Sequence, residues 1–217
     1  MSIQTIIDNA TYIKFGRTKT AGQTISRSGR VLTSARPTSQ PFNFEVGMHD
    51  ALRYSENRDL IEELDKLDIT TEEGIDIGTT NTNLSYITAY KGSLSASNIS
   101  QITATSASGT NLVLNTTGVS GSPGGTAFKK GDFIQLGSSY RYPYRVTADV
   151  SYNATSMTVP LHRPFIDQDS YTVSGKSIVV GSAVTFKVKM LAKPEYRVYP
   201  HDLLAFDDAF SLIEIIE

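Results

Sequence analysis

Residues 138–150 have the sequence SSYRYPYRVTADV, in which two kinds of residue alternate. One series is aromatic and then aliphatic: Tyr140, Tyr142, Tyr144 and Val146. The positions between them hold Arg141, Pro143 and Arg145. A period of two is typical of a β-strand with one buried face. The alternation therefore predicts a strand whose tyrosines face a core and whose arginines and proline face outward.

The same stretch fits a second interpretation, a platform for single-stranded nucleic acid. Tyrosines can stack on bases while arginines hold phosphates. The whole chain, however, has a net charge of −2 and a sequence pI near 5.9, which favours neither nucleic acid nor an anionic membrane as a partner. We therefore predict one strand of a small barrel and no specific binding of nucleic acid.

Composition limits the classes of protein to which the chain can belong. It has 217 residues, 39% of them hydrophobic, enough for one elaborated domain or two small ones. It has no cysteine, and therefore no disulfide and no thiolate nucleophile. No apolar run approaches the roughly 20 residues of a spanning helix, and residues 1–16 lack the pattern of a signal peptide. We expect a soluble chain that begins at Met1, is made in the cytoplasm and has no membrane partner.

One segment has a clear helical pattern, SENRDLIEELDKL at 55–67. Leu60, Ile61, Leu64 and Leu67 form an apolar stripe at helical spacing, and Ser55 is a suitable N-cap. Most other segments have strand patterns, so the expected fold class is mainly β with one helix. The predicted strands cover residues 11–15, 42–46, 75–77, 84–90, 111–114, 132–136, 140–146, 156–159, 177–180, 184–191 and 195–199.

A change in composition divides the chain. Residues 92–125 are dense in Ser, Thr, Gly and Asn, which predicts flexible turns and short polar strands. Three strand-like runs joined by short turns follow. Together with the strand at 112–114 they predict a compact unit of about 80 residues, the size of an OB-like barrel closed to remove its edges.

Patterns that indicate catalysis or metal binding are weak. The three histidines, His49, His162 and His201, have no metal-ligand spacing. The Gly-rich GSPGGT at 121–126 lacks the Lys and Ser/Thr of a phosphate-binding loop, and no serine lies in a G-x-S-x-G motif. We predict no catalytic residue, no metal, no cofactor and no enzyme activity.

Charge is segregated along the chain. Residues 1–44 hold six basic residues and one acid, a net charge of +5, whereas residues 45–76 hold eleven acids and three basic residues. Residues 201–217 hold five acids and no Lys or Arg. Complementary segments can pair copies of one chain with each other. The alternative is that these charges form solvated faces without a partner.

Several stretches resemble the distal tail protein family of long-tailed bacteriophages. They are SGRVLTSARPTSQPFNFEV (28–46), SENRDLIEELDKLD (55–68), GIDIG (74–78) and the tail VTFKVKMLAKPEYRVYPHDLLAFDDAFSLIEIIE (184–217). KKGDFIQLGSSYRYPYRV (129–146) is similar to the inserted OB-like domain of some members. The resemblance implies a β-sandwich or barrel core of residues 1–90 and 173–217 with one helix, and an insert at 91–172.

The resemblance also implies an architectural function. Family members form rings, here expected to contain six copies, that join the end of the tail tube to the hub, tip or baseplate proteins. The protein would then be located in the virion tail. In such a ring the basic segment of one copy would face the acidic segments of the next. The candidate interface residues are Arg27, Arg30 and Arg36 against Asp59, Glu62, Glu63, Asp207 and Asp208, and Arg141 and Arg145 are candidate contacts of the insert with another partner.

Other classes of protein remain open at this stage. A carbohydrate-binding β module for host attachment would need exposed aromatic side chains on one face, for which the candidates are Tyr140, Tyr142, Tyr144, Tyr152 and Tyr171. A virion-associated hydrolase would need a cleft with paired carboxylates. An unrelated β-rich assembly protein is a further alternative.

Overall fold

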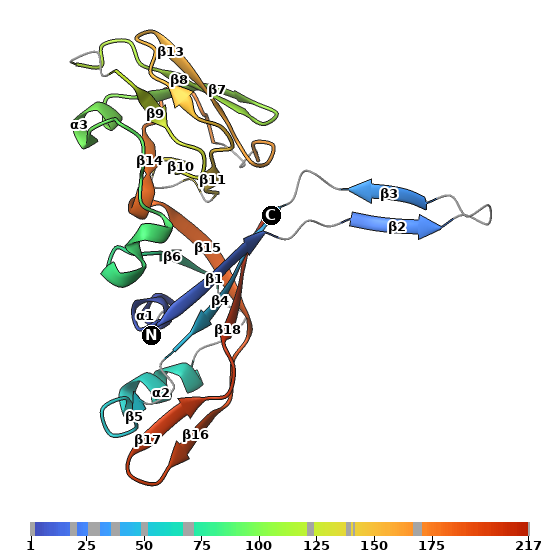
Figure 1. The fold of residues 1–217 in the computed structure, drawn as a ribbon, viewed down its shortest axis with the longest axis vertical. Coiled ribbons are helices and arrows are strands. Elements are labelled where there is room, and N and C mark those ends of the chain that lie inside the picture. The colour runs from blue at the N-terminus through green and yellow to red at the C-terminus, as the bar shows by residue number, and fades with distance from the viewer. Residues whose placement is uncertain are drawn as a thin grey trace. The chain divides into compact units, whose positions relative to one another are not determined.

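The computed structural model describes residues 3–17, 21–25, 31–35, 40–48, 52–66, 72–120, 124–137, 140, 142–166 and 171–216. The fold is mainly β, as predicted, and several sheets are present (Figure 1). The chain divides into two compact units. Unit 1 comprises Met1–Arg17, Pro41–Ile87 and Phe186–Glu217, and unit 2 comprises Thr18–Gln40 and Thr88–Thr185. Unit 2 therefore extends beyond the predicted insert of 91–172.

Unit 1 is organised around a five-stranded sheet in the order β1-β4-β18-β15-β6. A second sheet has the order β16-β17-β5. The elements of unit 1 are α1 (Ile3–Asp8), β1 (Tyr12–Arg17), β4 (Phe42–Gly47), β5 (Leu52–Arg53), α2 (Arg58–Lys66), β6 (Glu72–Asp76), the 3-10 helix η1 (Thr82–Ile87), β15 (Thr185–Ala192), β16 (Tyr196–Tyr199), β17 (Leu203–Phe206) and β18 (Phe210–Glu214).

An aromatic cluster holds the five-stranded sheet together. Strand β4 alternates, so that Phe42 and Phe44 point into the core and are almost fully buried. The Phe15 ring lies 4.9 Å from that of Phe42 and 5.0 Å from that of Phe44. Phe186 of β15 meets both Phe42 and Phe44 edge-on, at 5.5 and 5.3 Å between ring centroids. Such edge-to-face pairs contribute roughly 0.5–1.5 kcal/mol each beyond their buried area.

Helix α2 confirms three residues of the predicted apolar stripe, because Leu60, Ile61 and Leu64 are buried, whereas Leu67 lies outside the described residues. Its start differs from the prediction. The helix begins at Arg58, since Ser55 donates its backbone N–H to the Asp202 carboxylate at 2.8 Å and its hydroxyl to the same group. Ser55 therefore anchors the β16–β17 hairpin, and the prediction that it caps the helix is wrong.

Helix α1 was not predicted from the sequence. It has six residues, too few to be stable alone. The Glu73 carboxylate accepts from the backbone N–H of Ile3 at its first turn, and the Gln4 amide exchanges hydrogen bonds with the backbone of Asp76 at 2.8 and 3.0 Å. Hydrogen bonds to β6 and its carboxylate side chain therefore stabilise a helix that is too short to be stable alone.

Unit 2 contains smaller sheets. Two have three strands, in the orders β13-β8-β7 and β11-β10-β14, and two have two strands, β12-β9 and β2-β3. The elements of unit 2 are β2 (Ala21–Ile25), β3 (Val31–Ala35), α3 (Ala96–Ile99), β7 (Thr103–Ser108), β8 (Asn111–Asn115), β9 (Thr126–Phe128), β10 (Phe133–Leu136), β11 (Tyr144–Arg145), β12 (Val150–Ser151), β13 (Ser156–Pro160), β14 (Ile178–Val180) and the 3-10 helix η2 (Gly181–Ala183).

The predicted closed OB-like barrel is wrong: in the described residues no sheet closes on itself. The edges of the two three-stranded sheets are joined by isolated bridges, Thr103 with Ser177 and Val146 with Leu161, and not by continuous ladders. Strand β11 has two residues and is preceded by Pro143, which has no N–H to donate to a ladder. A long ladder through this strand cannot form, and the arrangement is that of packed small sheets.

The predicted strand at 140–146 is accordingly wrong in extent, but its tyrosines face the core as expected. Tyr140, Tyr142 and Tyr144 are 1%, 2% and 1% exposed. Pro143 is also buried, contrary to the prediction that it faces outward. The Tyr140 and Tyr144 hydroxyls lie 3.0 Å apart, and Tyr144 accepts from the backbone N–H of Ile166 at 2.8 Å.

Two further predictions are corrected by the structure. Residues 84–90, predicted as a strand, lie largely in the 3-10 helix η1, because Asn81 fixes a turn there. Its buried side chain donates to the carbonyls of Ile7 and Ala10 at 3.2 and 3.0 Å, and its own carbonyl accepts from Leu84. No strand was predicted between residues 15 and 42, yet β2 and β3 lie there and pair from Ala21 with Ala35 to Ile25 with Val31.

In the part of the chain that the structure describes, no helix combines the length and the apolar character needed to cross a bilayer.

Candidate functional site: a mixed aromatic and acidic pocket in unit 1

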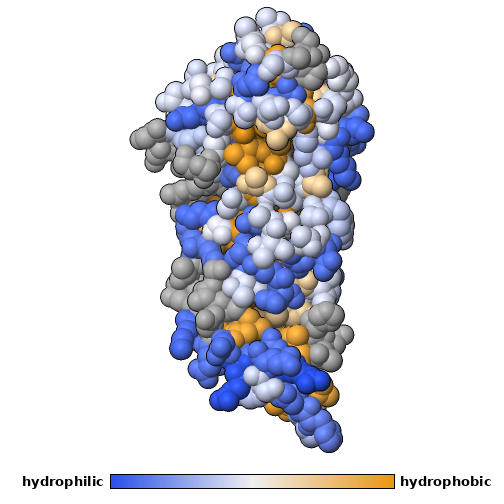
Figure 2. Space-filling view, turned by 90° about the vertical axis from the view of Figure 1, so that its left-hand side faces the viewer, coloured by the Kyte–Doolittle hydropathy of each residue, from blue (hydrophilic) through white to orange (hydrophobic). Residues whose placement is uncertain are grey.

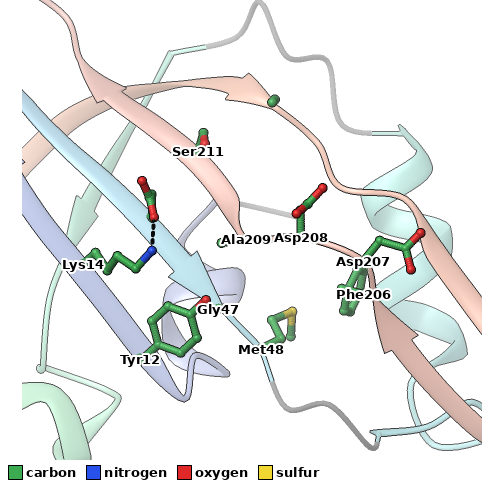
Figure 3. Close-up of a pocket in the computed structure, with 11 residues that line it drawn as sticks. Tyr12, Lys14, Gly47, Met48, Phe206, Asp207, Asp208, Ala209 and Ser211 are labelled. Carbon is green, nitrogen blue, oxygen red and sulfur yellow. Dashed lines mark hydrogen bonds and ion pairs between the residues drawn. The ribbon is translucent and has the colours of Figure 1, made fainter.

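Unit 1 contains an open pocket of about 470 Å³ where β1 and β4 meet the turn between β17 and β18 (Figure 3). In the view of Figure 3, the side chains of Tyr12, Met48 and Phe206 lie along its lower side, with the Asp208 carboxylate above them. The lining residues are Tyr12, Lys14, Glu45, Gly47, Met48, Ala192, Phe206, Asp207, Asp208, Ala209 and Ser211.

The sheet register positions the aromatic side of this pocket. Strands β1 and β4 are antiparallel with Tyr12 opposite Gly47. A Cβ atom at Gly47 would lie 2.0 Å from Cε1 of Tyr12. Only glycine leaves room for the Tyr12 ring in this position, where the side chain is 45% exposed. The ring is therefore held at the surface by a specific local arrangement.

Two of the pocket's acids are already neutralised within the chain. Lys14 Nζ lies 2.6 Å from Glu45 Oε2, and this hydrogen bond raises the pKa of Lys14. The Asp207 carboxylate accepts from Nε of Arg197 and lies 3.0 Å from Nη2, and its charge raises the pKa of Arg197. Asp208 is exposed and has no ion pair or hydrogen bond to any other described side chain. The pocket thus retains one uncompensated carboxylate.

Exposed hydrophobic side chains are concentrated in unit 1. Among residues whose burial is described, six large ones are more than a third exposed: Tyr12, Tyr86, Leu191, Val198, Tyr199 and Leu203. All six belong to unit 1. Three lie at the end of the β16–β17 hairpin. The face drawn in Figure 2 is mostly hydrophilic and shows hydrophobic patches in both its upper and its lower part.

The end of that hairpin has an uncommon backbone conformation. His201 and Asp202 both adopt left-handed backbone conformations, with φ of 66° and 65°. Such angles are uncommon for residues other than glycine. They are maintained because Asp202 bonds to Ser55 through its side chain and to the Tyr54 N–H through its carbonyl, at 2.9 Å. The bond from the Ser55 hydroxyl lowers the pKa of Asp202.

The structure locates some of the predicted interface residues. Asp59 and Glu62 are exposed on α2, and Asp207 and Asp208 line the pocket. Asp207 is paired with Arg197 of the same chain. Arg27, Arg30, Arg36 and Arg141 lie outside the described residues, as does the side chain of Glu63.

Arg145 is partly buried. Its guanidinium lies 6.0 Å from the centroid of the Phe133 ring, and its backbone N–H donates to Nδ1 of His162 at 3.0 Å. The side chain therefore packs on unit 2 and does not extend freely from it. The same unit holds a fully buried arginine that sequence reasoning missed: Arg163 donates to the carbonyls of Gln40 and Pro143 at 3.2 and 3.0 Å.

Burial of the tyrosines bears on the two alternative binding functions. Tyr140, Tyr142 and Tyr144 cannot stack on bases or sugars from solvent, because each is almost fully enclosed. Tyr152 and Tyr171 are partly buried, and the Tyr171 hydroxyl donates to the Leu136 carbonyl at 2.8 Å. The aromatic face that a carbohydrate-binding module would need is not formed by these residues.

Sequence reasoning also missed the aromatic side of the pocket. The acidic pair in FDDAF was noticed, but Tyr12, Met48 and Phe206 come from separate segments. Among the described residues, no group of three or more His, Cys, Asp and Glu side chains is arranged to hold a metal ion. No protein-family model matches the chain, and no curated protein matches its sequence.

Proposed function

We propose that this chain is a structural protein of a phage tail, a ring-forming distal tail or baseplate hub component that joins the end of the tail tube to the hub or tip complex. Its place is then in the virion, its first partner is a further copy of itself, and it has no enzymatic role. The resemblance of residues 28–46, 55–68, 74–78, 129–146 and 184–217 to distal tail proteins is the starting point of this proposal.

The structural observation that supports it best is the uneven surface of the two units. Single exposed hydrophobic residues are normal on any protein. Among the residues whose burial is described, the six large exposed ones all belong to unit 1, and Val198, Tyr199 and Leu203 cluster at one hairpin end that is bonded to Ser55. A surface of this kind suits contact with another protein subunit.

The hairpin β2–β3 gives independent support. Among the described strands, β2 and β3 pair only with each other. An isolated two-stranded hairpin is at best marginally stable in water. A neighbouring subunit in a ring would supply the missing packing surface, and it would also explain why a segment between two adjacent strands, β1 and β4, is so long.

Size-exclusion chromatography with light scattering, followed by negative-stain electron microscopy, tests the proposal over a concentration series at low salt. We expect rings with sixfold or threefold averages and a central hole wide enough for duplex DNA. Monomers at every concentration would contradict it. Exposed ion pairs are screened by salt, so rings held by the segregated charges should weaken in molar salt.

A further inference from the structure

We propose that the pocket beside Asp208 is the acceptor site for an arginine side chain of a second copy of this chain, supplied by residues 26–30. This inference rests on the proposed ring and names one of its contacts. It concerns the pocket bounded by Tyr12, Met48, Phe206 and Asp208.

The lining of the pocket matches the chemistry of a guanidinium group. Lys14 neutralises Glu45, and Arg197 neutralises Asp207, so the unmatched charge is that of Asp208. A guanidinium can pair with a carboxylate through two parallel hydrogen bonds and stack its flat face on an aromatic ring. Tyr12 and Phe206 offer such rings on the opposite side of the pocket in Figure 3. A lysine ammonium could make the ion pair but not the planar stack.

The size of the pocket fits a side chain. Its volume of about 470 Å³ leaves ample room for an arginine side chain. The Tyr12 side of the pocket forms without an occupant, because Gly47 opposite leaves room for the ring. Binding there would cost little reorganisation.

The chain itself carries a suitable donor. Residues 18–40 contain four basic residues and no acid. Two of the four, Arg27 and Arg30, fall in the sequence SRSGR that connects β2 to β3, just beyond the last register pair of Ile25 with Val31. Since β2 and β3 pair with no other described strand, this hairpin gains stability by docking. The basic hairpin of a second copy is therefore the occupant that fits both the proposed ring and the charge of the pocket.

Two charge reversals test the contact. Asp208→Arg alone, and Arg27→Asp with Arg30→Asp, should each weaken self-association at least about tenfold, because each puts like charges together. The matched control is Glu195→Arg, which reverses an exposed acid of unit 1 that does not line the pocket. It should leave self-association unchanged.

Mixing the two defective variants gives the decisive measurement. In a head-to-tail ring that alternates them, the pocket changed by Asp208→Arg meets the acidic hairpin and the wild-type pocket meets the wild-type hairpin, so every contact is again complementary. We expect the mixture to form rings and each variant alone to remain smaller, as judged by light scattering. Fold integrity of each variant is checked by circular dichroism and thermal unfolding.

Each other outcome overturns the inference in a distinguishable way. If wild-type rings form and Asp208→Arg assembles equally well, the pocket is not the acceptor, and the proposed function stands. A further variant carries Asp208→Arg, Arg27→Asp and Arg30→Asp in one chain. If this variant assembles and the mixture does not, the contact lies within one chain. If the wild type never assembles, both the ring and this contact are wrong.

Discussion

The two units of this protein use tyrosine in opposite ways. In unit 1, Tyr12, Tyr86 and Tyr199 are 45%, 67% and 45% exposed. In unit 2, Tyr140 and Tyr144 are enclosed and bonded to each other, stacked against Phe165 at 5.2 Å between centroids. Burial raises the pKa of Tyr140, and it raises the pKa of Tyr90 to about 12.

This contrast shows that aromatic content alone does not reveal a binding surface. The conspicuous tyrosine series of unit 2 belongs to its framework, where hydroxyl groups satisfy backbone atoms that would otherwise be buried without partners. The surface tyrosines of unit 1 are scattered in sequence and inconspicuous. The buried tyrosines of unit 2 thus find their partners inside the unit, whereas unit 1 exposes tyrosines at its surface.

The largest expected effect is on the framework of unit 2. Tyr144→Ala removes a buried ring together with its bond to Ile166, and we expect it to lower the free energy of unfolding by about 3–5 kcal/mol. Hydrogen exchange should show lost protection at unit 2 amides such as that of Ile134, with less change at Phe44 of unit 1. Tyr86→Ala, at an exposed site, is the control and should change stability by less than about 0.5 kcal/mol. Equal loss of protection in both units would show that they unfold as one.

At the surface of unit 1, by contrast, substitutions should weaken association and leave stability almost unchanged. Tyr199→Ser combined with Leu203→Ser removes two exposed hydrophobic side chains that face each other in the β16–β17 register. We expect little change in stability and association weakened by about tenfold or more, since buried apolar area drives association. Analytical ultracentrifugation measures the strength of association. Unchanged association would exclude this hairpin end from the interface.

A smaller effect is expected at the pocket. Gly47 of β4 is the test position there, and Gly16 of the neighbouring strand β1 is its control. Gly47→Ala pushes the Tyr12 ring aside, because the new Cβ would lie 2.0 Å from it, whereas nothing lies within 4 Å of a Cβ at Gly16. Since Tyr12 is exposed and can move, Gly47→Ala should cost at most about 1 kcal/mol of stability but weaken assembly several-fold. Gly16→Ala should leave assembly unchanged. If the two variants assemble alike, the ring of Tyr12 has no part in the contact.

Where packing followed a regular period, the sequence predicted the fold well. The stripe of Leu60, Ile61 and Leu64 marked α2, and alternation marked β4 and β15. It failed where side chains from distant segments decide the backbone. Helix α1 depends on Glu73, about 70 residues away. Prediction from the sequence also failed at residues 140–146, where Pro143 has no N–H to donate and the strand is only two residues long. Alternation predicted which side chains are buried but not whether the backbone has strand partners.

The pocket illustrates the same limit for function. Asp207 and Asp208 were selected for their charge, yet their difference in role depends on Arg197 across the hairpin, which already neutralises one of them. The aromatic residues opposite come from β1 and β17, which are far apart in sequence. No local pattern links these segments, because the sheet order β1-β4-β18 that brings them together is a property of the fold.

The smallest effect concerns the hairpin end that unit 1 exposes, and it depends on pH. Because the bonds from Ser55 lower the pKa of Asp202, this contact stabilises the fold above the unfolded value of about 3.9, and its contribution is lost as pH falls through the lower folded value. Asp202→Asn keeps the shape and tolerates the left-handed backbone but cannot ionise. Thermal unfolding should therefore show the wild type slightly more stable than the variant at neutral pH, with the difference shrinking as acid protonates the folded Asp202 carboxylate. Asp202→Ala, which disfavours a φ of 65°, should be less stable than the wild type at every pH. If the wild type and Asp202→Asn differ by the same amount at all pH values, the ionised carboxylate is not what holds the hairpin end, and its rigidity comes from the Tyr54 bond to the Asp202 carbonyl.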